Sequence, residues 1–294
     1  MEGWLRKFEK EFLKKPGEHL LEIGITGSGK TQGLYWIVDG LISRGKDEIV
    51  VWFDTGKAGE ILTLAKMKPV RLLIPETFDV VVTPEDKFDI EKVHFIDPKE
   101  IWNLLDEDRI NVVSLYPFLM EYELYSKCFA RAFKALIVYA HMYRIPTPLS
   151  IFFDEFHNIV PGHGEGESER IQRLARNIQL NVEKLRSLEV RMVATTHGWQ
   201  KIRRGVRMSF NWIIARRGTN FNRQDEPKLY NYNPKFQKLQ NDEAIIVYPN
   251  RIFSDIIHLP KYPDGKELGM VRYVGFKDLL DDEFDIQLIR AGKV

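Results

Sequence analysis

Residues 24–31 read Gly-Ile-Thr-Gly-Ser-Gly-Lys-Thr, and this stretch decides the fold. It fits the pattern G-x-x-x-x-G-K-[ST] with no mismatch. A short apolar run at residues 20–25 precedes it, and apolar side chains recur at helical spacing over residues 30–43. A buried strand, a glycine-rich turn and a helix in this order predict a phosphate-binding loop, because successive backbone N–H groups can point at phosphate oxygens.

The residue types in this loop predict a nucleotide triphosphate with a magnesium ion. Lys30 is expected to reach the β- and γ-phosphates, and the Thr31 hydroxyl to ligate Mg²⁺. The expected cofactors are therefore ATP and Mg²⁺. The expected nucleotide-binding residues are Gly24, Thr26, Gly27, Ser28, Gly29, Lys30 and Thr31. The alternative is a glycine-rich turn that binds no ligand.

Two adjacent carboxylates follow the apolar stretch at residues 149–153, which is LSIFF. A buried parallel strand would deliver Asp154 and Glu155 to the carboxyl edge of the sheet, where the phosphate loop also lies. Asp154 is then expected to hold Mg²⁺, and Glu155 to act as general base on the attacking water. The alternative is a solvated pair at the end of a strand.

Strand and helix patterns alternate along most of the chain. Apolar strands are predicted at residues 48–54, 111–115, 190–196 and 212–215, and helices at 121–144 and 167–188. This predicts an α/β fold with a mostly parallel central sheet and helices on both faces. Residues 243–248 and 254–259 are expected to extend it with antiparallel strands.

The predicted domain plan is one large domain with additions at both ends. We expect an amphipathic helix within residues 1–18, an ATPase domain at 19–260 with an elaboration at about 60–110, and a C-terminal extension at 261–294. The first helix is expected to pack on the core of its own domain. A membrane-surface or partner-docking helix is the alternative.

Composition narrows the functional class. Lys and Arg total 43 against 42 Asp and Glu, so nucleic-acid binding would need a local basic patch. The single cysteine, Cys128, excludes a disulfide framework within one chain. Apolar runs all fall short of the ~18–20 residues that a membrane span needs, and the charged start does not resemble a secretory signal. We therefore expect a cytoplasmic protein, or one in the host cytoplasm if the source is viral.

Absent motifs exclude several classes of phosphate-loop protein. The chain has no N-K-x-D guanine-recognition motif and no L-S-G-G-Q transporter signature. Asp154-Glu155-Phe156-His157 fits a DExH helicase box, but too few residues follow His197 for a complete second motor domain. A single motor domain must borrow its catalytic arginine from a neighbour, which predicts a ring.

Several blocks together resemble a known family. They are GITGSGKT, then a strand ending at Asp54 followed by TGKAGE, NVVSLYPF (111–118), LSIFFDEFHNIVP (149–161), EKLRSLEVRMVATTH (183–197) and VRMSFNWIIARRG (206–218). The order resembles the FtsK–HerA superfamily of ring-forming DNA pumps over about residues 18–260. It is most similar to archaeal HerA-type ATPases and viral genome-packaging ATPases. The resemblance implies a RecA-like P-loop NTPase.

The resemblance also implies roles for single residues. His197 stands where the family usually has a glutamine that senses the γ-phosphate; a structural histidine is the alternative. Arg207, Arg216 and Arg217 are candidates for the arginine that completes a site, in a neighbour or in cis. Asp154 and Glu155 keep the metal and water roles given above.

A basic run follows the predicted sensor strand. Lys201, Arg203 and Arg204 are expected to contact DNA phosphates without reading sequence, so binding would weaken with salt. A solvated basic face or a subunit interface is equally compatible with the run. His157, His163 and the glycines at 162–166 predict a flexible loop. No histidine metal site is expected there, because the spacing places no third ligand.

The main functional hypothesis is a hexameric or pentameric ring that hydrolyses ATP to move double-stranded DNA, as a genome-packaging or DNA-transfer motor. The HerA-type proteins carry a β-barrel ahead of the motor, whereas this phosphate loop begins at residue 24, which favours a minimal translocase. One alternative is a helicase that works with a nuclease in repair; others are a secretion or assembly ATPase and a nucleotide-gated structural subunit. Expected partners are duplex DNA, further copies of the chain, and a nuclease or a viral capsid or portal component.

Overall fold

The computed structural model describes residues 2–44, 48–55, 59–120, 122–143, 147–162 and 169–275. The chain divides into two compact units. The first is built from Met1–Val50 and Arg144–Tyr262, and the second from Val51–Tyr143 and Pro263–Val294. Strand β2 (Ile49–Phe53) begins in the first of these ranges and ends in the second.

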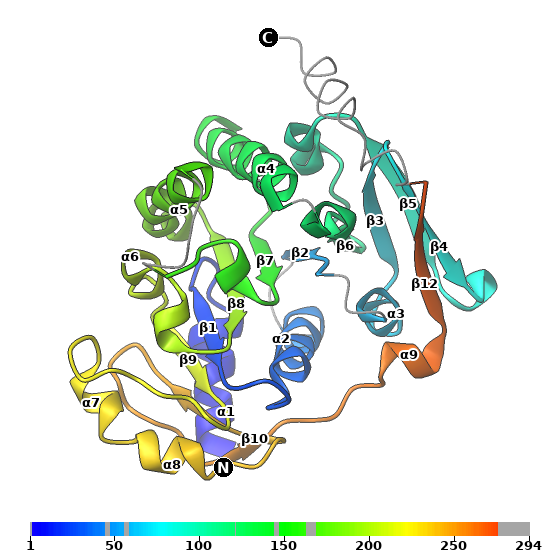
Figure 1. Cartoon of the computed structure of the whole chain (residues 1–294). Coiled ribbons are helices and arrows are strands. Elements are labelled where there is room, and N and C mark those ends of the chain that lie inside the picture. Colours follow the sequence, from blue (N-terminus) through cyan, green and yellow to red (C-terminus); the bar gives the residue numbers. More distant parts are fainter. Residues whose placement is uncertain are drawn as a thin grey trace. The chain divides into compact units, whose positions relative to one another are not determined.

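The first unit contains a mostly parallel sheet. Its strands are β1 (Leu20–Ile23), β7 (Leu149–Phe153), β8 (Val190–Thr196), β9 (Trp212–Ala215), β10 (Glu243–Val247) and β11 (Ile257–His258). They lie in the order β11-β10-β9-β1-β8-β7 (Figure 1). β7, β8, β1 and β9 are parallel, whereas β10 and β11 are antiparallel to their neighbours. The predicted fold class is confirmed, including the antiparallel extension near the C-terminus.

Every residue of β1, β7, β8 and β9 is buried, so both faces of these strands are covered. The helical segments of this unit are α1 (Glu2–Phe8), the π-helix η1 (Glu9–Leu13), α2 (Lys30–Arg44), η5 (Phe156–Asn158), α5 (Glu169–Ser187), η6 (Trp199–Lys201), α6 (Arg204–Arg207), α7 (Pro227–Tyr230) and α8 (Asn233–Gln237). The predicted ends of α2 and α5 differ from these by at most two residues, which is ordinary for frayed helix ends.

The N-terminal segment packs on the core of its own unit, as expected. Phe8 and Phe12 are buried, and the Phe8 ring stacks on Trp36 at 5.2 Å between centroids and meets the edge of Trp212 at 5.6 Å. The fully buried Arg191 on β8 donates to the carbonyl oxygen of Phe12 at 2.9 Å. Burial of these aromatic side chains explains why the segment stays on the sheet.

His19 is a second buried polar anchor beside this sheet. One ring nitrogen, Nε2, lies 2.7 Å from the carbonyl oxygen of Val182, and Nδ1 accepts from the backbone N–H of Met192 at 3.1 Å. Both contacts are satisfied by the neutral ring protonated on Nε2. Burial lowers the pKa of His19 to about 4, so the ring is neutral near pH 7.

The second unit has its own strands and helices. β6 (Ile110–Val113), β3 (Val70–Pro75) and β5 (Ile90–Phe95) are parallel, in the order β6-β3-β5. β4 (Asp79–Thr83) pairs antiparallel with β12 (Met270–Val274) in a separate two-stranded sheet. Its helical segments are α3 (Glu60–Ala65), η2 (Glu85–Lys87), η3 (Pro98–Asn103), η4 (Tyr116–Met120), α4 (Tyr122–Tyr143) and α9 (Gly265–Leu268). The expected elaboration at about 60–110 thus contains two regular parallel strands.

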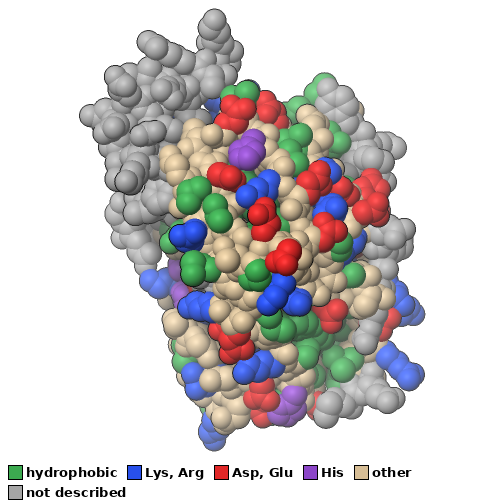
Figure 2. All heavy atoms as spheres, turned by 90° about the vertical axis from the view of Figure 1, so that its right-hand side faces the viewer, with side chains coloured by type: hydrophobic (Ala, Val, Ile, Leu, Met, Phe, Trp, Pro, Cys, Tyr) green, Lys and Arg blue, Asp and Glu red, His purple; other side chains and the backbone are tan. Residues whose placement is uncertain are grey.

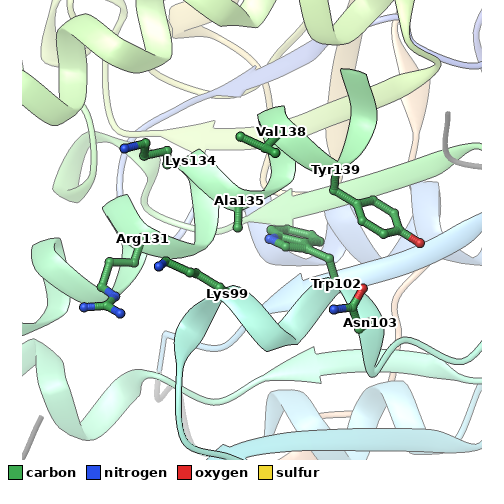
Figure 3. Close-up of a pocket in the computed structure, with 8 residues that line it drawn as sticks. All are labelled: Lys99, Trp102, Asn103, Arg131, Lys134, Ala135, Val138 and Tyr139. Atoms are coloured by element: carbon green, nitrogen blue, oxygen red, sulfur yellow. The ribbon is translucent and has the colours of Figure 1, made fainter. Parts of the chain in front are cut away.

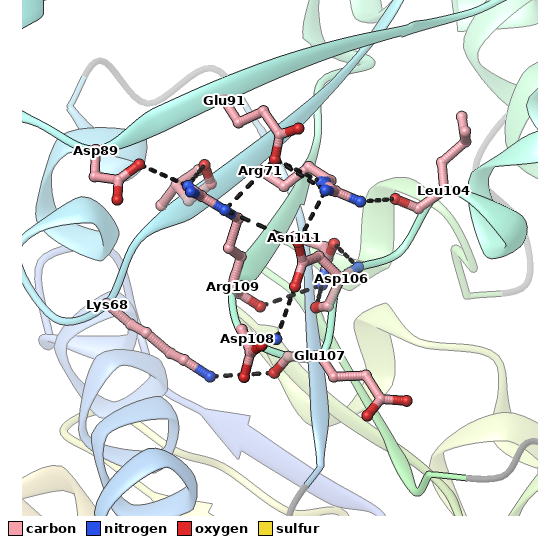
Figure 4. Close-up of polar contacts among 11 residues, drawn as sticks. Lys68, Arg71, Asp89, Glu91, Leu104, Asp106, Glu107, Asp108, Arg109 and Asn111 are labelled. Carbon is pink, nitrogen blue, oxygen red and sulfur yellow. Dashed lines mark hydrogen bonds and ion pairs between the residues drawn. The ribbon is translucent and has the colours of Figure 1, made fainter.

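Charged residues cluster where β3, β5 and β6 begin (Figure 4). The Arg71 guanidinium pairs with Glu91 at 2.9 Å and with Asp106 at 2.8 Å, and that of Arg109 pairs with Asp89 at 2.7 Å. These side chains are partly exposed, so each pair contributes only modestly to stability. Figure 2 shows acidic and basic side chains interspersed over the face that it presents, in keeping with the near-zero net charge.

The second unit also encloses a cavity of about 690 Å³ between η3 and α4 (Figure 3). The residues that line it are Lys99, Trp102, Asn103, Arg131, Lys134, Ala135, Val138 and Tyr139. Trp102 is buried and donates from Nε1 to the carbonyl oxygen of Ala132 at 2.7 Å. This cavity contains none of the site residues predicted from the sequence.

Candidate active site

The phosphate loop connects β1 to α2 and is anchored to the two neighbouring strands. The backbone N–H of Gly24 donates to the carbonyl oxygen of Thr196 at 3.2 Å, and that of Ile25 donates to Arg217 at 3.1 Å. Gly27 and Gly29 adopt φ values of 74° and 82°, a region that favours glycine. The loop is therefore fixed at the carboxyl ends of β8 and β9, with its glycines where the turn requires them.

Lys30 lies at the start of α2 and folds back over the loop. Its Nζ donates to the carbonyl oxygens of Gly24 at 3.0 Å and Ile25 at 3.2 Å, and lies 3.1 Å from Nδ1 of His197. These contacts hold Nζ beside the loop. An incoming phosphate would exchange these neutral acceptors for charged ones, which make stronger hydrogen bonds.

Thr31 and Asp154 meet across the edge of the sheet, as the sequence predicted. The Thr31 hydroxyl donates to Oδ2 of Asp154 at 2.8 Å. Asp154 is buried and also accepts from the Thr195 hydroxyl and from the backbone N–H of Glu155 at 3.1 Å. A hydroxyl beside a carboxylate forms an oxygen donor set of the kind that Mg²⁺ prefers, so these residues fit that ion.

Glu155 is held in a left-handed backbone conformation, with φ 54° and ψ 45°. Such a conformation costs a non-glycine residue roughly 1–2 kcal/mol. Its carboxylate oxygen Oε2 lies 2.7 Å from Nε2 of His197 and 3.6 Å from Nε2 of His157. The geometry therefore places a carboxylate at the phosphate edge beside two imidazoles.

His197 connects the lysine of the loop to the acidic pair. With Lys30 donating to Nδ1, the neutral ring carries its proton on Nε2, the atom that lies 2.7 Å from Oε2 of Glu155. His197 thus lies against both Lys30 and Glu155.

The sequence placed His157 in a flexible loop and did not predict which residues lie beside it. The structure brings one ligand atom each of Glu155, His157 and His197 within 4.8 Å of one another. Burial lowers the pKa of His157; the Glu155 charge opposes this shift, and the charges of His197 and Lys30 reinforce it. The sequence spacing gave no sign of this group, because His197 lies on a different strand. The rest of the expected glycine-rich loop, residues 163–166, lies outside the described residues.

Arg216 lies beneath the phosphate loop with its side chain 1% exposed. Its guanidinium donates to the carbonyl oxygens of Gly29 at 2.7 Å and Asn241 at 3.1 Å, and its Nε lies 3.2 Å from Oε1 of Glu22. Burial raises the pKa of Glu22 to about 8, against the opposing charges of Arg216 and Lys30. These contacts make Arg216 a support for its own loop, and its burial leaves it no access to another subunit.

The Arg207 side chain is likewise bound to other residues of its own unit. It donates to the carbonyl oxygen of Ile202 at 2.6 Å, pairs with Asp225, and lies 5.5 Å over the Trp199 ring. Although burial acts to raise it, hydrogen bonds from Arg207 and Arg204 hold the pKa of Asp225 at about 2. Of the three candidate arginines, Arg217 alone is partly exposed.

The basic run contacts the segment that leads away from Glu155. Lys201 is exposed, and Arg204 is exposed but paired with Asp225 at 2.7 Å. The Gly162 N–H donates to the carbonyl oxygen of Lys201 at 2.9 Å, and the Arg203 N–H donates to Val160 at 3.3 Å. The backbone around Lys201 and Arg203 is therefore tied to the chain that follows the acidic pair.

Comparisons with known proteins show similarity in structure only. No family model matches the sequence, and no curated protein matches it. The bacterial conjugative coupling protein TrwB is similar in structure with a TM-score of 0.56 and 10% identity, over 85% of this chain and 87% of that one. The fold is that of a RecA-like P-loop ATPase. The likeness to TrwB is therefore one of fold, which is the fold that the sequence predicted.

Two further P-loop ATPases are similar at lower scores. The genome-packaging NTPase B204 of Sulfolobus turreted icosahedral virus 2, in complex with AMPPCP, has a TM-score of 0.46 and 13% identity over 83% of this chain and 98% of that one. The cytoplasmic domain of the Thermomonospora curvata type VII secretion ATPase EccC has a TM-score of 0.46 and 12% identity, over 86% of this chain and 24% of that one. Among the described residues, no helix is long and apolar enough to cross a bilayer.

Proposed function

We propose that this chain is an ATPase that uses hydrolysis to move double-stranded DNA. The observation that carries the proposal is the contact between Thr31 and Asp154 at 2.8 Å, with Glu155 next in sequence. It unites the phosphate loop with a carboxylate pair at one edge of one sheet. A glycine-rich turn without a ligand has no need for this arrangement.

We assign each of these residues a role in ATP hydrolysis. Lys30 would bind the β- and γ-phosphates of ATP, and Thr31 and Asp154 would hold Mg²⁺, which supplies charge neutralisation at the phosphates. Glu155 would take a proton from the water that attacks the γ-phosphorus, while the bond to the bridging oxygen breaks and ADP leaves. His197, at 2.7 Å from Glu155, would hold that carboxylate toward the water.

The proposed contact with DNA rests on charge and on backbone connection. Lys201 and Arg203 would track phosphates, while Arg204 is partly neutralised by Asp225. The backbone hydrogen bonds from Gly162 and Arg203 join this segment to the chain after Glu155. A shift of the acidic pair on hydrolysis would therefore move the basic segment.

A ring follows from the arginine requirement. Arg217 is the candidate that could reach a neighbouring subunit, because Arg207 and Arg216 are buried in pairs of their own. Mixing Arg217→Ala subunits with Glu155→Gln subunits tests this directly. Each variant alone should be inactive, and the mixture should regain hydrolysis at sites that combine an intact Glu155 with a neighbour's Arg217. A mixture that stays inactive excludes a role for Arg217 in a neighbour.

The coupling to DNA is tested by ATP hydrolysis with and without duplex DNA across a series of salt concentrations. We expect stimulation that falls with salt. Removing both Lys201 and Arg203 should lower the salt slope of duplex binding by about 2, since each phosphate contact contributes about 0.9. Lys228→Ala is the matched control, because Lys228 is exposed on α7 of the same unit. A rate of ATP hydrolysis that is unchanged by duplex DNA at every salt concentration would favour a secretion or assembly ATPase.

A further inference from the structure

Glu155, His157 and His197 form a group of ligand-bearing side chains that hydrolysis alone does not explain. Hydrolysis as proposed uses the carboxylate of Glu155 and one contact from His197. His157 adds a second imidazole near the same oxygen, with the two rings 5.0 Å apart between centroids. Its Nδ1 is buried and makes no hydrogen bond.

The distances suit a small transition-metal ion. Ligands of a tetrahedral Zn²⁺ lie ~2.0–2.1 Å from the ion and hence about 3.4 Å from one another. Oε2 of Glu155 lies 3.6 Å from Nε2 of His157 and 2.7 Å from Nε2 of His197. Small side-chain rotations would bring all three atoms onto one ion. Two imidazoles and a carboxylate form the donor set of many zinc sites, whereas Mg²⁺ prefers oxygen ligands only.

We propose that Glu155, His157 and His197 bind a borderline transition-metal ion such as Zn²⁺, and that this ion blocks hydrolysis. The inhibitory part rests on the proposed function, because it requires that Glu155 acts as the base. A metal ion on Oε2 would withdraw electron density from the carboxylate and lower its basicity toward the attacking water. The ion would thus oppose the activity that Mg²⁺ supports.

Metal binding would also disturb the phosphate loop. If Nε2 of His197 ligates the ion, the proton of the neutral ring moves to Nδ1, which can then no longer accept from Lys30. The hydroxyl of Thr26, 3.4 Å from Nδ1, is positioned to accept this proton in a hydrogen bond. The lysine would lose this contact with Nδ1, so the ion acts on both halves of the site.

The test uses the whole chain without nucleotide and without Mg²⁺. Co²⁺ is added as a spectroscopic probe, and its tetrahedral visible bands are followed while Zn²⁺ displaces it. We expect bands in the wild type, and an affinity weakened by at least ~100-fold in His157→Gln and in His197→Gln, since even outer-shell partners of a metal are worth ~10–100-fold. His141→Gln is the matched control, because His141 is exposed on α4. Thermal melting of each variant confirms that it folds.

Inhibition is measured separately, as the Zn²⁺ sensitivity of ATP hydrolysis relative to each protein's own rate in Mg²⁺. The wild type and His141→Gln should be inhibited at Zn²⁺ concentrations that leave His157→Gln unaffected. Absent Co²⁺ bands in the wild type, or bands equally strong in folded His157→Gln, would overturn the metal site. Bands without inhibition would overturn the inhibitory role. If the wild type does not hydrolyse ATP, the proposed function fails. The Co²⁺ spectrum then still decides whether the metal site exists.

Discussion

Replacing Arg216 by methionine removes the buried cation beneath the phosphate loop. Methionine keeps an unbranched side chain of similar length but donates no hydrogen bonds. The acceptors that lose their donor are the carbonyl oxygens of Gly29, Asn241 and Glu243, at 2.7, 3.1 and 3.3 Å. Glu22 loses the guanidinium whose Nε lies 3.2 Å from its carboxyl oxygen.

The expected cost at pH 7 is about 1–3 kcal/mol of unfolding free energy, which is typical when buried acceptors lose their donor. It should depend on pH. Because burial raises the pKa of Glu22 to about 8, the wild type loses stability as pH rises from the ordinary carboxyl range to about 8 and then levels off. Without Arg216 that pKa rises further, so the gap between the two proteins should widen above pH 8 by up to ~1.4 kcal/mol per pH unit.

Urea unfolding followed by tryptophan fluorescence at pH 7 and pH 9 measures this cost. Arg217→Met is the matched control and should stay within about 0.5 kcal/mol of the wild type, as expected for a partly exposed side chain. Adding Glu22→Gln to Arg216→Met removes the titrating group and should abolish the widening. An Arg216→Met protein as stable as the wild type at both pH values, yet inactive, would refute the supporting role and return Arg216 to the hydrolysis machinery.

Three further predictions follow from buried or constrained positions. The neutral His19 ring supplies stability that is fully present above pH 6.5 and is lost as pH falls toward 4, about 3 kcal/mol in total. The unfolding free energy of His19→Asn should therefore fall less than that of the wild type between pH 6.5 and 4. In Gly29→Ala the new Cβ would lie 2.3 Å from a guanidinium nitrogen at φ 82°, so the affinity for a fluorescent ATP analogue should fall at least ~10-fold, whereas Gly3→Ala, with open space around it, should bind normally. Asp225→Asn should lower the unfolding free energy by roughly 2 kcal/mol because Arg207 loses its charged partner; an unchanged urea midpoint would contradict that pairing.

The phosphate loop and the acidic pair could be predicted because their signals are local. Gly24 to Thr31 follow an apolar strand directly, and Asp154 ends another, so parallel pairing alone brings them to one edge. The same locality explains why α2, α4 and α5 were predicted with nearly correct ends.

Other features depend on distant pairing that sequence spacing does not reveal. β12 pairs with β4 although the two strands lie far apart in the sequence, so the residues of β12 do not show where it pairs. Arg216 looked like a candidate for a neighbour's site because arginines follow the strand. Only the contact with Glu22, from a strand near the other end of the sequence, shows that it is buried and paired.

The grouping of Glu155, His157 and His197 could not be predicted for the same reason. His157 lies two residues after the carboxylate, but the second imidazole comes from the end of β8. The strand order β1-β8-β7 brings these residues together. The hydrophobic periodicity of a sequence predicts single strands but not their order in the sheet.

The most direct measurement of the central claim is the rate of ATP hydrolysis by Glu155→Gln beside its nucleotide affinity. The substitution keeps the shape of the side chain and removes the base. We predict nucleotide binding close to that of the wild type and hydrolysis slower by at least ~100-fold, the contribution of a positioned general base. Hydrolysis at the wild-type rate in a folded Glu155→Gln protein would contradict the assignment of this edge of the sheet as the active site.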